Sequence, residues 1–202
     1  MTLLKLVAAF IRRKPLTWSF HALTLALGVA VLTAILALNG ALEGRFQRDL
    51  AGIDLVVGAK GSPLQLIMSS VFELDQPTGN IPLSTLPLMQ QNMMVRRVVP
   101  VSLGDNVGGF RIVGTSTEYP AIYGGRLAQG ALWTQPMQAV IGSEAERALH
   151  YRIGQSFVGD HGLAPGGETH KDSPYVVTGV LAPTGTVLDR LVLTDTASVW
   201  QV

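Results

Sequence analysis

The chain has 202 residues and a net charge of +1, with 48% hydrophobic residues, 14% charged residues and no cysteine. A net charge so close to zero creates no long-range field for nucleic acid, so we expect no nucleic-acid partner. Without cysteine, neither a disulfide framework nor a thiolate metal site can form. The length allows one membrane segment followed by an ordinary domain.

Residues 1–15 are basic and have no acidic side chain. Apolar residues recur at helical spacing from Leu4 to Ile11, and the basic residues lie off this stripe. The pattern predicts a short helix in the headgroup region of a membrane, on the cytoplasmic side. The alternative is an N-terminal extension of the helix that follows, and Pro15 argues against such continuity.

An uninterrupted apolar run extends from Leu16 to Leu38 and contains no Asp, Glu, Lys or Arg; its single titratable side chain is His21. About 20 apolar residues suffice to cross the hydrocarbon core, and a segment in lipid must be helical to pair its backbone groups. We therefore predict a transmembrane helix at residues 16–38. A cleaved signal peptide has the same order of charge and apolarity, but its apolar core would be only about 7–15 residues long. The length favours a retained anchor.

The residues that flank this run predict its orientation. Lys5, Arg12, Arg13 and Lys14 precede it, whereas Asn39 and Gly40 follow it. By the positive-inside rule, the N-terminus stays in the cytoplasm and the rest of the chain is translocated.

Residues 39–52 continue the helical pattern with mixed polarity. Leu42, Phe46 and Leu50 keep a four-residue spacing among polar neighbours, and Gly52 ends the segment. The spacing predicts an amphipathic stalk that extends from the membrane into solvent. Such a stalk either couples motion in the membrane to motion outside it or serves as a spacer.

Residues 53–202 predict a mixed α+β domain. The run IDLVV at 53–57 is typical of a buried strand. A helix is predicted from Pro63, with Ser62 and Gln65 as a capping box. A second helix is predicted from Ser84 to about residue 94, with its methionines Met89, Met93 and Met94 packed.

The remaining elements of this domain are predicted from apolar runs between turn signals. Residues 98–103 and 109–113 read as a hairpin. A strand at 138–141 precedes a helix with a capping box in Ser143 and Glu146. Further strands are predicted at 157–158, 175–181 and 190–193, and Asp195 is predicted to cap a final helix.

Three stretches resemble a known family. IDLVVGAKGSPLQLIMSSVFELDQPTGNI at 53–81 is similar to the opening of the periplasmic core domain of MacB/FtsX-type ABC transporter permeases. AVIGSEAERALHYRIGQSF at 139–157 resembles its strand–helix–strand unit, and VVTGVLAPTGTVLDRLVLTDTASVW at 176–200 resembles the segment that closes the domain. Together with the order of elements, the resemblance covers essentially the whole chain.

The resemblance implies a subunit of the bacterial inner membrane with a periplasmic core domain. In that family, partner ATPases move the membrane helices and the stalk transmits the motion, for export or for mechanotransmission. The expected partners are a separate ABC ATPase subunit, a second copy or another permease in the membrane, and a periplasmic protein. Family members have three more membrane helices after this domain, and no second spanning run occurs here. We expect either the N-terminal part of a longer permease or a single-span relative.

Motifs for catalysis are missing from the sequence. It contains no Gly-x-x-x-x-Gly-Lys-Ser/Thr loop, no Gly-x-Ser-x-Gly elbow and no His-Glu-x-x-His pair. ATP binding by a phosphate loop is therefore excluded, and a tethered hydrolase is disfavoured. We predict that the chain is not an enzyme and that ATPase activity belongs to a separate subunit.

One loop is rich in metal-ligating side chains. The stretch GDHGLAPGGETHKD contains Asp160 and Asp172 together with His161, Glu168 and His170. Neutral imidazole and carboxylate groups are standard zinc ligands, so His161, Glu168 and His170 are a candidate zinc site. The alternative is a solvated loop, in which Gly, Asp and His are ordinary. A membrane-anchored periplasmic zinc-binding or accessory module is thus the second functional hypothesis.

Overall fold

The structure is a computed structural model that describes residues 2–160 and 173–201. It divides into two compact units, Met1–Phe46 and Gln47–Val202, which are described in turn.

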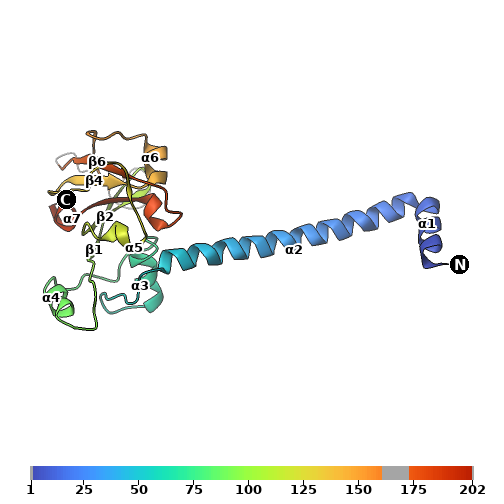
Figure 1. Cartoon of the computed structure of the whole chain (residues 1–202), viewed down its shortest axis with the longest axis horizontal. Helices are drawn as coiled ribbons and strands as arrows, with labels where there is room; N and C mark the ends of the chain where they lie inside the picture. Colours follow the sequence, from blue (N-terminus) through green and yellow to red (C-terminus); the bar gives the residue numbers. More distant parts are fainter. Residues whose placement is uncertain (1, 161–172, 202) are drawn as a thin grey trace. The chain divides into compact units, whose positions relative to one another are not determined.

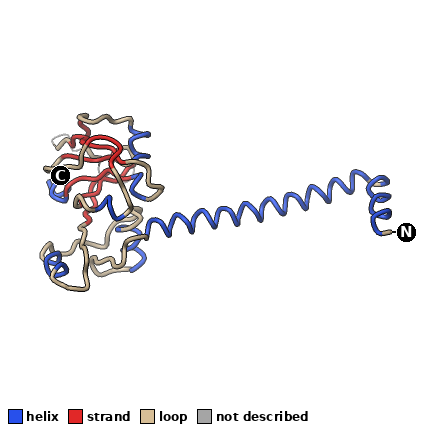
Figure 2. Tube along the Cα trace, in the orientation of Figure 1, coloured by secondary structure: helices blue, strands red, loops and turns tan. Residues whose placement is uncertain are grey.

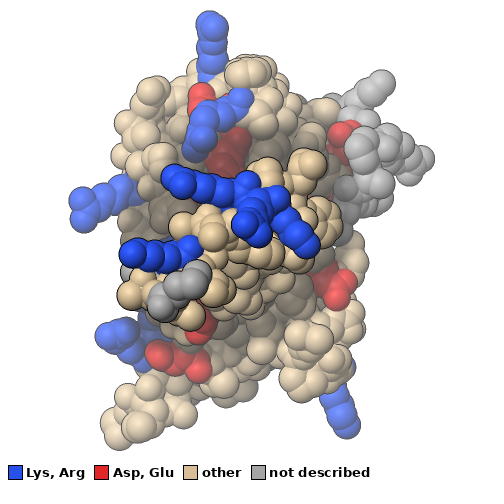
Figure 3. Space-filling model, turned by 90° about the vertical axis from the view of Figure 1, so that its right-hand side faces the viewer, with Lys and Arg blue, Asp and Glu red and all other residues tan. Residues whose placement is uncertain are grey.

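The first unit is helical. Helix α1 (Leu3–Arg13) precedes α2 (Pro15–Leu50), and Lys14 between them has a non-helical backbone. Pro15 begins α2, where its missing N–H costs no hydrogen bond and its clash with a preceding turn is avoided. Figure 1 shows α1 turning away from the axis of α2. In Figure 3, Lys and Arg side chains gather at the end nearest the viewer, where α1 lies, and Arg12 and Arg13 end this helix.

Helix α2 is the one helix in the described ranges that is long and apolar enough to cross a membrane. Its most apolar stretch has a mean hydropathy of 2.2 and no buried residue. The hydroxyls of Ser19, Thr24 and Thr33 donate to carbonyls one turn earlier, at 2.9, 3.0 and 2.8 Å. These three hydroxyl groups are therefore paired inside the segment, as a hydrocarbon environment requires. The last turn of α2 belongs to the second unit.

The second unit is built on a mixed seven-stranded sheet, drawn red in Figure 2. The order is β1-β2-β7-β4-β6-β3, with β5 also paired to β6. Strands β2 and β7 are parallel, as are β4 and β6, whereas the other pairs are antiparallel. The strands are β1 (Val101–Val107), β2 (Phe110–Thr115), β3 (Leu127–Gly130), β4 (Gln138–Ile141), β5 (Ser156–Phe157), β6 (Tyr175–Leu181) and β7 (Leu191–Asp195).

The central strands are buried on both faces. Alternate residues of a strand point to opposite faces of the sheet, so Leu193 and Val192 enter two different hydrophobic clusters. The first cluster adds residues of α5 (Tyr119–Ile122), of the 3₁₀ helix η1 (Val187–Arg190) and Trp133. The second is closed by α6 (Ser143–Leu149) and by stacked aromatic rings. Helix α7 (Thr196–Gln201) packs on β1 and β2.

Residues 54–98, which we call the arm, contain two short helices, α3 (Pro63–Ser70) and α4 (Thr85–Gln90), and no strand. The predicted strand at 53–57 is therefore wrong: these residues are irregular, and Leu55 is 71% exposed. Met93 and Met94 lie beyond α4 and are 100% and 91% exposed, so the prediction that they pack is also wrong.

The helix starts differ from the two predicted capping boxes. Ser62 is at the cap position of α3, but its side chain makes no capping bond, and Gln65 donates to the carbonyl of Gln76 instead. The cap position of α6 is Gly142, not Ser143. The predicted hairpin is confirmed in β1 and β2, and the Asp195 carboxylate accepts from the Ala197 N–H at 2.8 Å, as predicted.

Candidate functional site at the end of the long helix

The last turn of α2 places a carboxylate inside the domain. Asp49 is 2% exposed, and its Oδ1 accepts a hydrogen bond from the backbone N–H of Val187 at 2.6 Å. The C-terminal end of a helix carries a partial negative charge, which repels a carboxylate. The buried side chain of Asp49 therefore needs a hydrogen-bond donor, and the Val187 N–H supplies it. Beside it, Nε of Arg48 donates to the carbonyl of Gly185 at 3.3 Å. Two neighbouring residues of α2 thus hold the segment that precedes β7.

That segment is itself held by a second buried carboxylate. Asp189 accepts from the backbone N–H groups of Thr184 and Gly185, each at 2.8 Å, and from the Thr184 hydroxyl at 2.9 Å. The Thr186 hydroxyl accepts from the N–H of Leu188 at 3.3 Å and so caps η1. Because its polar groups are satisfied internally, the turn 184–189 can act as a preformed receptor for Asp49.

Gly142 fixes the same turn from the other side. A Cβ at this position would overlap the backbone carbonyls of Leu188 and Asp189, and the Gly142 N–H donates to the carbonyl of Leu191 at 2.8 Å. Glycine is therefore required for the close approach of two backbones. The Gly-Ser-Glu stretch that resembles the family positions η1 in this way.

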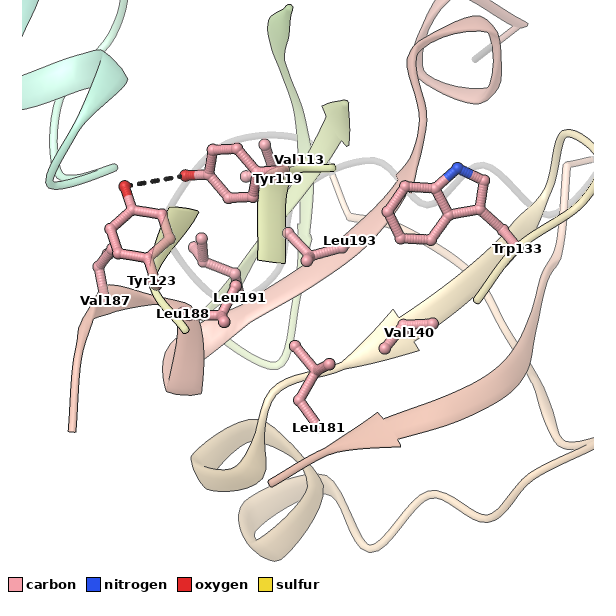
Figure 4. Close-up of a cluster of buried hydrophobic side chains, with 10 residues drawn as sticks. All are labelled: Val113, Tyr119, Tyr123, Trp133, Val140, Leu181, Val187, Leu188, Leu191 and Leu193. Atoms are coloured by element: carbon pink, nitrogen blue, oxygen red, sulfur yellow. Dashed lines mark hydrogen bonds between the residues drawn. The ribbon is translucent and has the colours of Figure 1, made fainter. Parts of the chain in front are cut away.

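A chain of buried polar side chains lies beside the first cluster. The hydroxyls of Tyr119 and Tyr123 are 3.4 Å apart, as the dashed line in Figure 4 shows. The Tyr119 hydroxyl also donates to Oε1 of Glu73 at 3.5 Å. Glu73 is 5% exposed and has a positive φ of 56°, which is uncommon for a residue with a side chain. These hydrogen-bonded side chains join α5 to the arm.

Burial dominates the electrostatics of these groups. Desolvation raises the pKa of Glu73 to about 8, against the charge of Arg111 and the hydrogen bond from Tyr119, which both lower it. Desolvation also raises the pKa of Tyr123 to about 12, and the charges of Glu73 and Asp49 add to this. Burial therefore favours the neutral form of Glu73 far above the pH at which an exposed glutamate ionises. The charge of Asp49, in the last turn of α2, thus acts on Tyr123.

Arg111 of β2 completes the arrangement. It is 5% exposed, and its Nη1 donates to the backbone carbonyl of Asp75 at 3.1 Å. Burial lowers its pKa, while the charges of Glu73 and Asp75 raise it. Within the described ranges, its Nε and Nη2 have no hydrogen-bond partner, and neither has Oε2 of Glu73.

The hydrogen bonds described above connect the last turn of α2 to the middle of the sheet. Asp49 holds the N–H of Val187, η1 leads directly into β7, and β7 lies between β2 and β4. The last turn of α2 is thus hydrogen-bonded to a segment that leads directly into a central strand.

The predicted zinc ligands His161, Glu168 and His170 lie outside the described residues, and so does Asp172. Asp160 is described, and its backbone forms a bridge with Asn106. Elsewhere in the described ranges, no group of three or more His, Asp or Glu side chains could hold a metal ion. The zinc site stays a prediction, which a calorimetric zinc titration with His161→Ala and His170→Ala would test.

The sequence did not single out Asp49, Glu73 or Arg111. Each is an ordinary charged residue in its local stretch, and its burial depends on segments far away in the chain. One weak signal was present: Asp49 lies on the same helix as the apolar stripe of the stalk and close to its end.

Comparison with known families gives a match along most of the chain. Residues 20–201 match the family model described as MacB-like periplasmic core domain. No curated protein sequence is a significant match.

Two solved structures are similar at low identity. One is the periplasmic region of MacB from Actinobacillus actinomycetemcomitans, with 18% identity, a TM-score of 0.45, and 60% of this chain and 58% of that chain covered. The other is a domain of a putative permease protein from Porphyromonas gingivalis, with 16% identity, a TM-score of 0.39, and coverages of 62% and 58%. The chain thus spans less than two thirds of the length of either structure.

Proposed function

Because the chain belongs to the MacB-like periplasmic core domain family of ABC-transporter permeases, we propose that it is a permease subunit that transmits ATP-driven motion to its periplasmic domain. The motion would start at a separate ABC ATPase subunit, pass along α2 and reach the sheet through Asp49. It would serve export or the mechanical activation of a partner.

The hydrogen bond from Val187 to Asp49 carries this proposal. The carboxylate is buried and the bond is short, at 2.6 Å, so it resists a pull better than an exposed contact would. The receiving turn is braced by Asp189 and leads into a central strand. A helix that served only as a spacer would need no buried carboxylate at its end.

The proposed location is the bacterial inner membrane, with α1 on the cytoplasmic side. The basic residues around Arg12 and Arg13 support this orientation through the positive-inside rule. Because the chain has no cysteine, a single cysteine can be introduced at Thr2 or at Gln129 without background labelling. A membrane-impermeant maleimide should label Gln129→Cys in spheroplasts, and Thr2→Cys only after lysis.

The decisive experiment uses the full chain with an ABC ATPase encoded beside it. The two proteins are co-expressed, solubilised in mild detergent and purified through a tag on the permease. We expect the ATPase to co-purify, and a spin-label pair on the domain to change its distance distribution between the ATP-bound and the ADP-vanadate states. Asp49→Ala should leave the ATPase bound and abolish the distance change.

Glu43→Gln is the matched control, because Glu43 is an exposed carboxylate on the same helix. It should keep both the ATPase and the distance change. Failure of every neighbouring ATPase to associate would contradict the permease proposal. Association with an unchanged response in Asp49→Ala would contradict the role of Asp49.

A further inference from the structure

Glu73 is a buried acidic residue and Arg111 is a buried basic residue, and each has side-chain atoms without a hydrogen-bond partner. Oε2 of Glu73 and both Nε and Nη2 of Arg111 are without partners within the described ranges. Such atoms are rare in protein interiors because a buried polar atom without a hydrogen-bond partner loses its interaction with water and gains nothing in return. The two side chains are close enough for the charge of Arg111 to act on Glu73.

A buried carboxyl can be accommodated in two ways. It can remain neutral, or it can ionise and pair with a cation through hydrogen bonds. In this structure Glu73 accepts a hydrogen bond from Tyr119, and burial raises its pKa against the attraction of Arg111, which favours the neutral form. The guanidinium nitrogens of Arg111 that lack a partner could accommodate the ionised form, because they could donate hydrogen bonds to its carboxylate.

We propose that Glu73 and Arg111 form a two-state pair that couples the end of α2 to the arm, an inference that rests on the proposed transmission function. In the state described here, Glu73 is neutral and bonded to Tyr119. In the second state it has released one proton to solvent, and its carboxylate accepts from the free nitrogens of Arg111.

The contacts around Glu73 show what this change would move. Its left-handed backbone is held by the turn after α3, in which the N–H of Leu74 donates to the carbonyl of Met68 at 3.0 Å. Arg111 already holds the carbonyl of Asp75, two residues further along. A shift of the carboxyl towards the guanidinium would therefore draw this part of the arm towards β2.

The other end of the chain of polar groups faces α2. When Glu73 pairs with Arg111, Tyr119 keeps Tyr123 as its partner, and Tyr123 is the group on which the Asp49 charge acts. The coupling is reciprocal, so movement of Asp49 would bias the state of Glu73. The titratable and charged groups that face Glu73 or its partners are Arg111, Tyr119, Tyr123, Asp75 and Asp49.

The test uses the full chain in lipid nanodiscs, without any ATPase. Spin labels are attached at Met93→Cys in the arm and at Gln129→Cys in β3, both of which are exposed. We expect the distance distribution to change between about pH 6 and about pH 9.5, and its midpoint to follow the pKa of Glu73, which is raised to about 8.

Two variants separate the pair from a general effect of pH. Glu73→Gln is close in shape and always neutral, so it should keep the low-pH distribution throughout. Arg111→Gln should keep the neutral state and shift the midpoint to higher pH. Glu118→Gln removes an exposed carboxylate beside Tyr119 and should respond as the unmodified chain does.

A second measurement covers the case in which a variant folds poorly. The carbon-13 signal of the Glu73 side-chain carboxyl should titrate near pH 8 in the unmodified chain. A titration near the ordinary value of 4.5, or an unchanged pH response in Glu73→Gln, would overturn the proposal. Neither result involves the ATPase, so failure of the pair and failure of the permease function are distinguishable.

Discussion

Apolar side chains of the same kind differ in solvent exposure between the sheet and much of the arm. In the sheet, Ile112, Ile141 and Leu193 are completely buried, because the central strands are covered on both faces. In the arm, Leu55, Leu64 and Leu88 are each about two-thirds exposed or more. The hydrogen bonds at Glu73 and at the carbonyl of Asp75 join the arm to the rest of the domain. Val71 and Phe72, just after α3, are buried and fix this part of the arm, whereas the exposed segments around Leu55 and Leu88 can change position at lower cost.

The largest difference in stability should appear when one leucine of the sheet and one leucine of the arm are each replaced by alanine. Leu193→Ala leaves a cavity in the core and should lower the free energy of unfolding by about 2–5 kcal/mol. Leu88→Ala removes the same atoms from an exposed site and should change it by less than about 0.5 kcal/mol. Urea unfolding of the full chain in detergent measures both, followed by tryptophan fluorescence in a Trp18→Phe, Trp200→Phe background in which the buried Trp133 is the remaining tryptophan. Equal losses would show that the arm is part of the core.

A smaller effect is expected where α2 enters the domain. Asp49→Ala leaves the N–H of Val187 buried without its acceptor and should cost about 1–3 kcal/mol of unfolding free energy. Hydrogen exchange at the Val187 amide should accelerate at the same time. Glu43→Ala is the control and should leave both unchanged; unaltered exchange in Asp49→Ala would remove Asp49 from the anchoring contact.

The next effect depends on pH and links the two regions. Because the pKa of Glu73 is raised from 4.5 to about 8, the folded chain holds a proton that the unfolded chain releases. This contribution to stability is complete below pH 4.5 and is lost as the pH rises to about 8. Unfolding free energies measured across this range should fall more steeply for the unmodified chain than for Glu73→Gln. Identical slopes would place Glu73 in a solvated environment.

The smallest effect should be seen at the tip of the arm. Met93→Ser and Met94→Ser change fully or almost fully exposed side chains, so the unfolding free energy should move by less than about 0.5 kcal/mol. A loss of more than about 1 kcal/mol in the same urea experiment would mean that these methionines are covered in solution.

The sequence predicted elements that depend on local signals. The hairpin of β1 and β2 turns at Gly108 and Gly109, which both have positive φ, and flanking apolar residues mark its strands. The long apolar helix and strand β6 were likewise predicted because each is a mainly apolar run in the sequence. The family assignment followed from several such stretches in order, and the match of residues 20–201 confirms it.

Predictions failed where distant segments decide the structure. The run at 53–57 has the composition of a strand, yet no neighbouring strand is available to it in the described ranges, and it remains irregular. The acceptor for the Val187 N–H is 138 positions away in the chain, so no local pattern could reveal it. Glutamate is normally exposed, and the burial of Glu73 results from packing against segments that are distant in the sequence.

The position of β7 has a consequence for how the domain is made. This strand follows all the other described strands in sequence, yet it lies between β2 and β4. During synthesis, the β1–β2 hairpin and the β4–β6 pair each keep an open edge until β7 emerges. Such non-local pairing slows folding and leaves unpaired edges open to aggregation. We therefore expect the sheet to complete its folding only after its last strand has been made.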